Sequence, residues 1–159
     1  MNKYIFSKDQ LQSYGQNGFL VCKNVFRPEE VLDLVKWSRE VENFKETTEK
    51  WMLYFDPSLK DENKMILTRI ENFVTFHQGL NKLLNSANFL NIVSQLFKEE
   101  AILFKDKYHL KHPGAKGFKP HQDATIWKDM YGISSFITIF IAIDESNLTN
   151  GCLEFSEGQ

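Results

Sequence analysis

Residues 101–114 read AILFKDKYHLKHPG and predict a β-strand that ends in a loop. From residue 102 to 110 every even position is apolar except Asp106, and from 103 to 111 every odd position is polar except Leu103. Successive side chains of a strand point to opposite faces of its sheet, so this alternation indicates one face toward a core and one toward water. Pro113 and Gly114 then predict a turn or loop. The chain therefore changes from helical to β character near residue 100.

Two more strands are predicted after this loop. Residues 134–143 are rich in β-branched and aromatic side chains, which favour strands. Asn150-Gly151 is a strong hairpin-turn signal, and residues 152–155 are expected to form the returning strand. A closed sandwich or barrel takes about eight strands. We therefore expect the domain to be cut short at its C-terminal end.

The first hundred residues read mainly as helices. A capping-box pattern at Ser7–Gln10 starts a short helix, and Pro28 opens an amphipathic helix over residues 28–45. Another amphipathic helix is predicted over residues 87–97. Short strands are predicted at residues 19–22, 51–55 and 64–70. Helices first and antiparallel strands later indicate an α+β protein with a β-sandwich or barrel core.

Length and composition indicate one globular domain. The chain has 159 residues, of which 42% are hydrophobic and 25% charged, as in ordinary folded proteins. The net charge of -2 argues against nucleic-acid binding, which needs clustered excess cations. Two distant cysteines give neither a disulfide framework nor a cysteine zinc site. Without a signal-peptide pattern or a bilayer-spanning apolar run, we expect a cytoplasmic protein without a membrane partner.

The clearest chemical pattern is His121-Gln122-Asp123, which follows the loop. In an extended chain, positions i and i+2 point to the same side, so an imidazole nitrogen and a carboxylate oxygen would converge. These are two of the three ligands of a 2-His-1-carboxylate metal site, whose open positions admit O2 and a cosubstrate. An alternative without a metal stays open, in which His121 ends a turn after Pro120 and Asp123 bonds to local backbone.

Other polar residues near this motif have an ordinary structural interpretation beside a functional one. His109 and His112 would face opposite sides of a strand, and we expect them at the surface rather than as metal ligands. Three lysines are expected to form a solvated strand face unless an anionic cosubstrate lies against it: Lys105, Lys107 and Lys111.

Two further features are open to more than one interpretation. Arg69 follows an apolar run and is a candidate for an ordinary ion pair. Trp127 and Tyr131 follow the histidine–aspartate pair and would either pack in the core or form the wall of a mobile lid. The sequence shows no Ser-His-Asp arrangement, phosphate-binding P-loop or dinucleotide glycine fingerprint, so hydrolase and nucleotide-binding functions have no support.

Six ordered motifs together resemble the phytanoyl-CoA dioxygenase family of Fe(II)- and 2-oxoglutarate-dependent oxygenases. The resemblance covers nearly the whole chain. Its motifs are the stretches 11–21, Phe26–Val31, Lys111–Gly114, Pro120–Asp123, Ile141–Asp144 and Asn150–Leu153. It implies N-terminal helices packed on a double-stranded β-helix, which is a cupin-like jelly roll, with a single oxygenase domain over residues 1–159 that is incomplete in this chain.

The resemblance also implies roles for individual residues. His121 and Asp123 look like two of the three iron ligands. Four residues fall where the family contacts 2-oxoglutarate: Arg69, Lys107, Gln122 and Phe140. The implied partners are a small-molecule substrate and O2. Because Asp123 stands where related halogenases have a small residue, the resemblance favours hydroxylation.

The resemblance is incomplete at the C-terminal end. In the family, a second iron-binding histidine and an arginine for 2-oxoglutarate lie farther along than Gln159. We therefore expect the 159 residues alone to bind iron weakly and to be inactive. Two other hypotheses stay open: a non-catalytic cupin-like binding module, and a hydrolytic zinc site on His109, His112 and His121.

Overall fold

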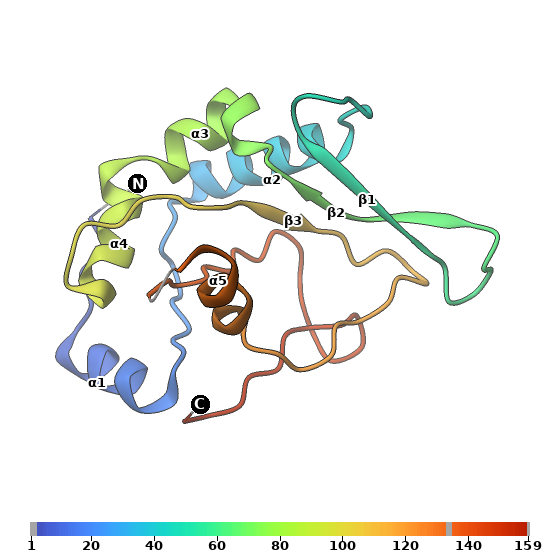
Figure 1. Cartoon of the computed structure of the whole chain (residues 1–159). Helices are drawn as coiled ribbons and strands as arrows, with labels where there is room; N and C mark the ends of the chain where they lie inside the picture. Colours follow the sequence, from blue (N-terminus) through green and yellow to red (C-terminus); the bar gives the residue numbers. More distant parts are fainter. Residues whose placement is uncertain (1–2, 133–134, 159) are drawn as a thin grey trace.

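The computed structural model describes residues 3–132 and 135–158 as helices around a small antiparallel sheet (Figure 1). The helices are α1 (Lys8–Asn17), α2 (Pro28–Glu42), the 3-10 helix η1 (Val74–Phe76), α3 (Gln78–Leu84), α4 (Ala87–Phe97) and α5 (Asp123–Tyr131). The strands are β1 (Met52–Pro57), β2 (Met65–Glu71) and β3 (Lys107–His109). This mixture confirms the α+β class.

The helix starts follow the capping chemistry predicted from the sequence. In α1 the Gln10 amide donates to Ser7 Oγ at 3.2 Å, while the Ser7 amide donates to the Gln10 side chain at 2.9 Å. Such a reciprocal capping box satisfies two amides that have no partner within the helix. Helix α4 spans the predicted residues, with Ser86 as its cap. Helix α2 ends at Glu42, three residues before the predicted end at 45.

The three strands form one sheet in the order β1-β2-β3, and both pairings are antiparallel. The predicted strands at 51–55 and 64–70 are confirmed as β1 and β2 within two residues at each end. A register shift between Tyr54 and Phe55 marks a bulge in β1. The strand predicted at 19–22 is wrong, because these residues have no ladder partner in the described part of the chain.

The second half of the chain departs most from the prediction. Only Lys107–His109 of the alternating stretch joins the sheet, and the described residues of the two later predicted strands, 135–143 and 152–155, have irregular backbone. Residue 134 lies outside the described residues. A strand needs backbone hydrogen bonds from a neighbour, and none of the described residues supplies a ladder to these segments. The jelly-roll core is therefore not confirmed.

The turn between those segments nevertheless forms. The Cys152 amide donates to the Asn147 carbonyl at 3.1 Å, and Gly151 has φ of 90°. A left-handed φ is accessible to glycine without a Cβ penalty. The Asn150-Gly151 turn signal is therefore confirmed without the strands that it was expected to join.

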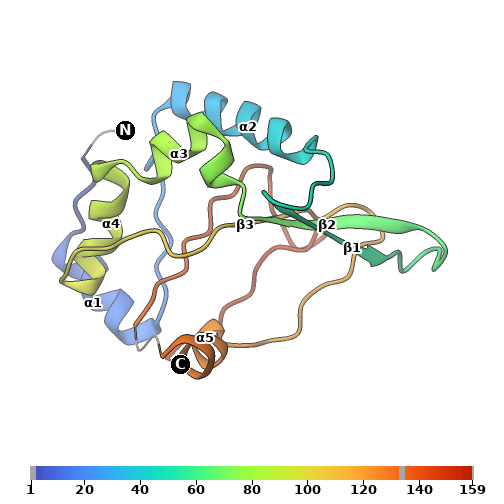
Figure 2. The same cartoon turned by 45° about the horizontal axis from the view of Figure 1, so that its top comes forward.

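The hydrophobic core lies between α2 and β2. Val41 of α2, Ile70 of β2 and Val74 of η1 are each less than 2% exposed, and they belong to one buried cluster. Figure 2 shows α2 and α3 on one side of the strands and α5 on the other. Burial of each aliphatic side chain contributes about 1.5–3 kcal/mol, so this cluster fixes the helical layer on one face of the sheet.

No described helix is long and apolar enough to cross a membrane.

His77 connects α3 to α2. Its Nδ1 accepts the Leu80 amide at 3.2 Å as the cap of α3, and its Nε2 lies 2.9 Å from a Glu40 carboxylate oxygen. The ring also contacts Trp37, with 5.9 Å between ring centres. Helices α2 and α3 approach so closely here that only a glycine fits at position 79, where a Cβ would lie 2.3 Å from the Trp37 ring.

We expect Gly79→Ala to lower the free energy of unfolding by about 1–3 kcal/mol, because the added methyl group must displace Trp37. Gly15→Ala in α1 is the matched control, since a Cβ there meets nothing within 4 Å. The control should stabilise the chain by up to about 1 kcal/mol through helix propensity. Urea unfolding measures both variants, and equal effects would contradict the close packing at Gly79.

Candidate functional site

His121 and Asp123 lie side by side at the start of α5. Gln122 has φ of −107° and ψ of 125°, so the chain enters the helix extended. His121 Nε2 lies 3.6 Å from Asp123 Oδ1. The i and i+2 side chains therefore converge, as an extended segment requires.

Hydrogen bonds orient both side chains. His121 Nδ1 lies 2.7 Å from the Lys119 carbonyl oxygen, which can only accept, so Nδ1 carries a hydrogen, and in the neutral ring Nε2 has the lone pair. The Thr138 hydroxyl donates to Asp123 Oδ2 at 3.1 Å. The local-turn interpretation thus fits His121, whereas the hydrogen bond to Asp123 comes from a distant segment. The pair presents one nitrogen and one carboxylate oxygen, which is a donor set suited to Fe(II).

A complete metal site is not assembled by these side chains alone. Among residues 3–132 and 135–158, no group of three or more His, Cys, Asp and Glu residues could hold a metal ion. The hypothesis of a zinc site on His109, His112 and His121 is therefore wrong for the described structure. The histidine–aspartate pair supplies two donors.

Arg69 and Lys107 lie on one face of the sheet. The pairing register sets Arg69 opposite His109 and Glu71 opposite Lys107, so all four side chains share this face. Buried Glu71 lies 3.1 Å from Arg69 Nε and 2.9 Å from Lys105 Nζ. Arg69 thus forms the ordinary ion pair that its sequence position allowed.

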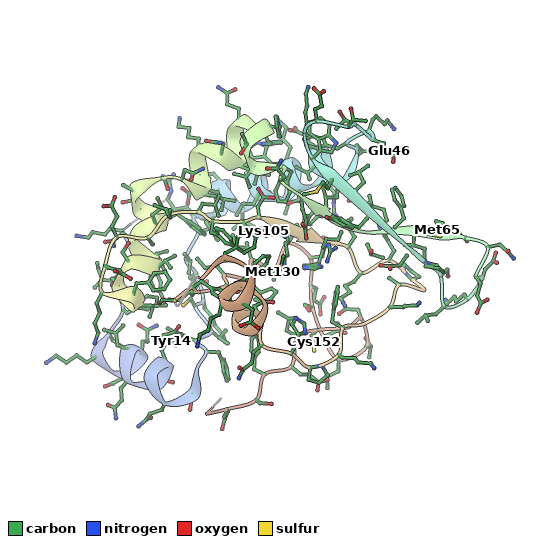
Figure 3. The ribbon with its side chains drawn as sticks, viewed as in Figure 1. Tyr14, Glu46, Met65, Lys105, Met130 and Cys152 are labelled. Atoms are coloured by element: carbon green, nitrogen blue, oxygen red, sulfur yellow. The ribbon has the colours of Figure 1, made fainter. Side chains whose placement is uncertain are left out.

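Trp127 links this face to α5. The Lys105 ammonium lies 4.9 Å from the centre of its ring and the Lys107 ammonium 5.6 Å, both within cation–π range. Figure 3 shows Lys105 close to α5. Phe104 and Tyr131 complete an aromatic cluster. The ring centre of Phe104 lies 5.6 Å from that of Trp127 and 5.9 Å from that of Tyr131. Trp127 therefore anchors α5 to the strand β3 and the residues before it.

Gln122 and Phe140 take no part in the contacts described for Arg69, Lys107 and Trp127. Gln122 is exposed and caps α5 without a side-chain hydrogen bond. Phe140 is 53% exposed, and its ring lies 6.5 Å from Phe155, which stacks on Phe19 at 4.9 Å. Within the described residues, Phe140 thus packs with the C-terminal segment, apart from the His121–Asp123 pair.

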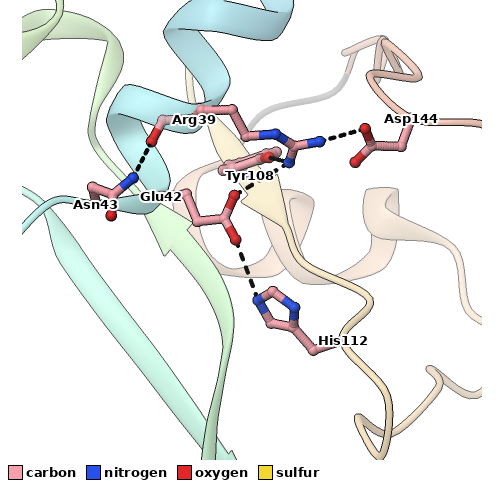
Figure 4. A network of polar contacts seen from close by, with 6 residues as sticks. All are labelled: Arg39, Glu42, Asn43, Tyr108, His112 and Asp144. Atoms are coloured by element: carbon pink, nitrogen blue, oxygen red, sulfur yellow. Dashed lines mark hydrogen bonds and ion pairs between the residues drawn. The ribbon is translucent and has the colours of Figure 1, made fainter.

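His112 belongs to a polar network that holds the C-terminal segment to α2 (Figure 4). Arg39 donates to Asp144 and, at 3.2 Å, to Glu42, while His112 Nε2 lies 3.5 Å from the other Glu42 oxygen. The Arg39 guanidinium also donates to the Tyr108 hydroxyl at 3.4 Å. The hydrogen bond from Arg39 holds the pKa of Asp144 below its ordinary value. His112 is exposed, as predicted, and has a structural partner.

His109 was expected at the surface and is instead largely enclosed. Its ring packs edge-on against Phe118 at 5.2 Å, and Phe118 in turn lies 6.4 Å from the His121 ring. The Nδ1 atom is buried without a hydrogen-bond partner in the described structure. The alternation in the sequence placed His109 on the polar face but carried no signal for the loop residue that covers it.

Comparisons with known proteins show what this chain is similar to. Residues 14–159 match the model of the family described as "Phytanoyl-CoA dioxygenase (PhyH)". The chain is 35% identical over 153 residues to a 2-aminoethylphosphonate dioxygenase of the uncultured bacterium HF130_AEPn_1, covering 96% of this chain and 58% of that relative. It is 31% identical over 147 residues to a methylphosphonate hydroxylase of Gimesia maris, covering 92% and 54%. The chain thus spans about half the length of these curated relatives.

We expect the pKa of His109 to lie below the ordinary histidine value of about 6.5. Burial disfavours the charged ring most, and the charges of Lys107, Arg69 and Lys111 add repulsion against a smaller opposing effect of Glu71. A pH titration of the ring protons by NMR measures this value. Because the unfolded chain takes up this proton first, acidification through about pH 6.5 should also lower stability.

The charge contribution to this pKa can be isolated with one substitution. Lys107→Gln removes a repulsive charge and should raise the midpoint of His109. Lys8→Gln in α1 is the control, because Lys8 is not among the charges that act on this ring. A His109 midpoint at or above the ordinary value in the unmodified chain would contradict its burial.

Proposed function

The chain belongs to the phytanoyl-CoA dioxygenase family, and from this membership we propose that it contributes to an Fe(II)- and 2-oxoglutarate-dependent dioxygenase that hydroxylates a small organic substrate. The observation that carries the proposal is the 3.6 Å approach of His121 Nε2 to Asp123 Oδ1. One imidazole nitrogen and one carboxylate oxygen at the N-terminus of α5 correspond to two of the three ligands of a 2-His-1-carboxylate site.

The residues around the pair fit this chemistry. His121 and Asp123 would hold the iron, with the Lys119 carbonyl and the Thr138 hydroxyl orienting them from outside. When bound, iron with 2-oxoglutarate and O2 supplies the oxidising power for hydroxylation of a C–H bond. Arg69 and Lys107 are proposed to attract the carboxylates of 2-oxoglutarate, and Gln122 and Phe140 to line its site.

The triad needs a second histidine, and the proposal places it outside these 159 residues. The other three histidines of the chain are His77, His109 and His112, and none of them joins the pair in the described structure. Reading the coding DNA beyond the Gln159 codon tests this part directly. A continuing frame with a histidine and then an arginine supports it, whereas a stop codon contradicts it.

The names of two relatives suggest the substrate class. The 2-aminoethylphosphonate dioxygenase and the methylphosphonate hydroxylase are both named for phosphonates. We propose that the substrate of this protein is likewise a small organic phosphonate.

A non-catalytic binding module is the second candidate. It is favoured by the finding that no three potential metal donors lie together among the described residues. Conversion of 2-oxoglutarate to succinate that depends on O2 separates the two functions, because only the oxygenase carries it out.

We expect Asp123→Ala to abolish Fe(II)-dependent succinate formation by the intact protein and to weaken Fe(II) binding by more than the roughly 10–100-fold typical of outer contacts. Thr138→Val removes only the hydrogen bond to Asp123 and should weaken binding by about 10–100-fold. Calorimetry measures both affinities. Asp129→Ala, an exposed carboxylate on the same helix, is the control.

The order of the three effects is the test. Loss of binding in Asp123→Ala with unchanged binding in Asp129→Ala supports the metal role. Equal affinity in all variants would contradict it and would favour the non-catalytic module.

A further inference from the structure

A cavity of about 160 Å³ opens beside the end of β3. His109 and Lys111 border it from the strand and its extension, Lys116 and Phe118 from the following loop, and Asp56 and Thr68 from the β1–β2 pair. An enclosed water needs about 10–15 Å³ of such a cavity, so the cavity has room for roughly ten water-sized groups. A small organic anion has fewer heavy atoms than that, so the cavity can hold one.

The charged groups of this cavity favour an anion. In the described structure the Lys111 ammonium lies 5.1 Å from the centre of the Phe118 ring, and neither Lys111 nor Lys116 has a carboxylate within ion-pair distance. Asp56 is the one acidic residue of the described lining, and one of its oxygens accepts the Thr68 hydroxyl at 2.6 Å. Two lysines and one carboxylate, which already accepts a hydrogen bond, thus line the cavity.

His109 adds a polar atom without a partner. Its Nδ1 is buried and makes no hydrogen bond within the described residues. Buried polar atoms are nearly always hydrogen-bonded, and an exception calls for an unseen ligand or water. The ring borders the same cavity as the two lysines, so a group bound there would lie beside the ring that carries this atom.

We propose that this cavity binds the phosphonate or phosphate group of a small ligand through Lys111, Lys116 and His109. The proposal rests on the proposed function where it takes this ligand to be the substrate, and it extends that function by assigning the residues that recognise it. Lysines bind phosphoryl oxygens as point charges, whereas planar carboxylates are typically held by the fork of an arginine. No arginine is among the described residues that line this cavity.

The anion site lies close to the candidate metal pair. Phe118 packs against His109 on one side and lies 6.4 Å, ring centre to ring centre, from His121 on the other. Phe118 therefore contacts both a histidine of the cavity and a candidate metal ligand.

The test measures binding of methylphosphonate and inorganic phosphate to the full 159-residue chain without metal, by calorimetry and by NMR shifts of the His109 ring. We expect Lys116→Gln and His109→Gln each to raise the dissociation constants by about tenfold or more, the usual loss of a hydrogen bond to a charged group. Lys64→Gln, a lysine of the β1–β2 turn outside the cavity, should leave them unchanged.

Each outcome decides the proposal. Ring shifts at His109 in the unmodified chain support it even if a variant fails to fold. No shift at His109, or equal losses in Lys64→Gln, overturns it. Binding of 2-oxoglutarate that depends on the same residues while phosphate binding does not would also overturn it, by assigning the cavity to the cosubstrate. Because no metal is present, phosphate binding would persist if the oxygenase function failed, and the two failures are distinguishable.

Discussion

The arrangement of the sheet depends on the hydrogen bonds that the Asp106 carboxylate accepts. It accepts the Phe73 amide at 3.0 Å and the Val74 amide at 3.2 Å, and these amides lie where β2 turns into η1. The chain that enters β3 is thereby fixed beside the end of β2, so that Glu71 pairs with Lys107. Burial raises the pKa of Asp106 against the opposing effect of the backbone amides of residues 72–74, so these donors offset only part of the desolvation of the carboxylate. A side chain without an acceptor oxygen, such as alanine, would leave both amides without this partner.

The same residue shows how far sequence reasoning reached for the fold. Asp106 was the exception in an otherwise alternating stretch, and the structure explains the exception, because position 106 serves the turn after β2 rather than the core. Capping residues and paired strands were predictable because their signals are local: Ser7 and Ser86 bond amides three residues away. The later strands were not predictable in this way. Residues 135–143 have strand-forming side chains, but strand formation depends on a partner backbone, which the described residues do not provide.

For the candidate site, the pattern of the sequence located the close pair but not its surroundings. His121 and Asp123 were identifiable because spacing of two in an extended segment fixes their direction. The enclosure of His109 arises from Phe118, a residue of the following loop, and no periodicity reports such a contact. The ion pairs of Glu71 with Arg69 and Lys105 likewise depend on two strands and the segment before the third. The family resemblance indicated Arg69 and Lys107 as contacts of 2-oxoglutarate, whereas only the fold shows that their side chains share one face of the sheet.

The two candidate metal donors are held by different means, and this has a consequence for the site. Asp123 is the first residue of α5, and Trp127 lies about one helical turn later, where Lys105 and Lys107 hold its ring against β3. His121 precedes the helix and is oriented by the Lys119 carbonyl of its own loop. The separation of the two donors therefore depends on how α5 is anchored to the sheet as well as on the loop. Because β3 is itself positioned by Asp106, this half-buried carboxylate connects the core of the fold to the geometry of the histidine–aspartate pair.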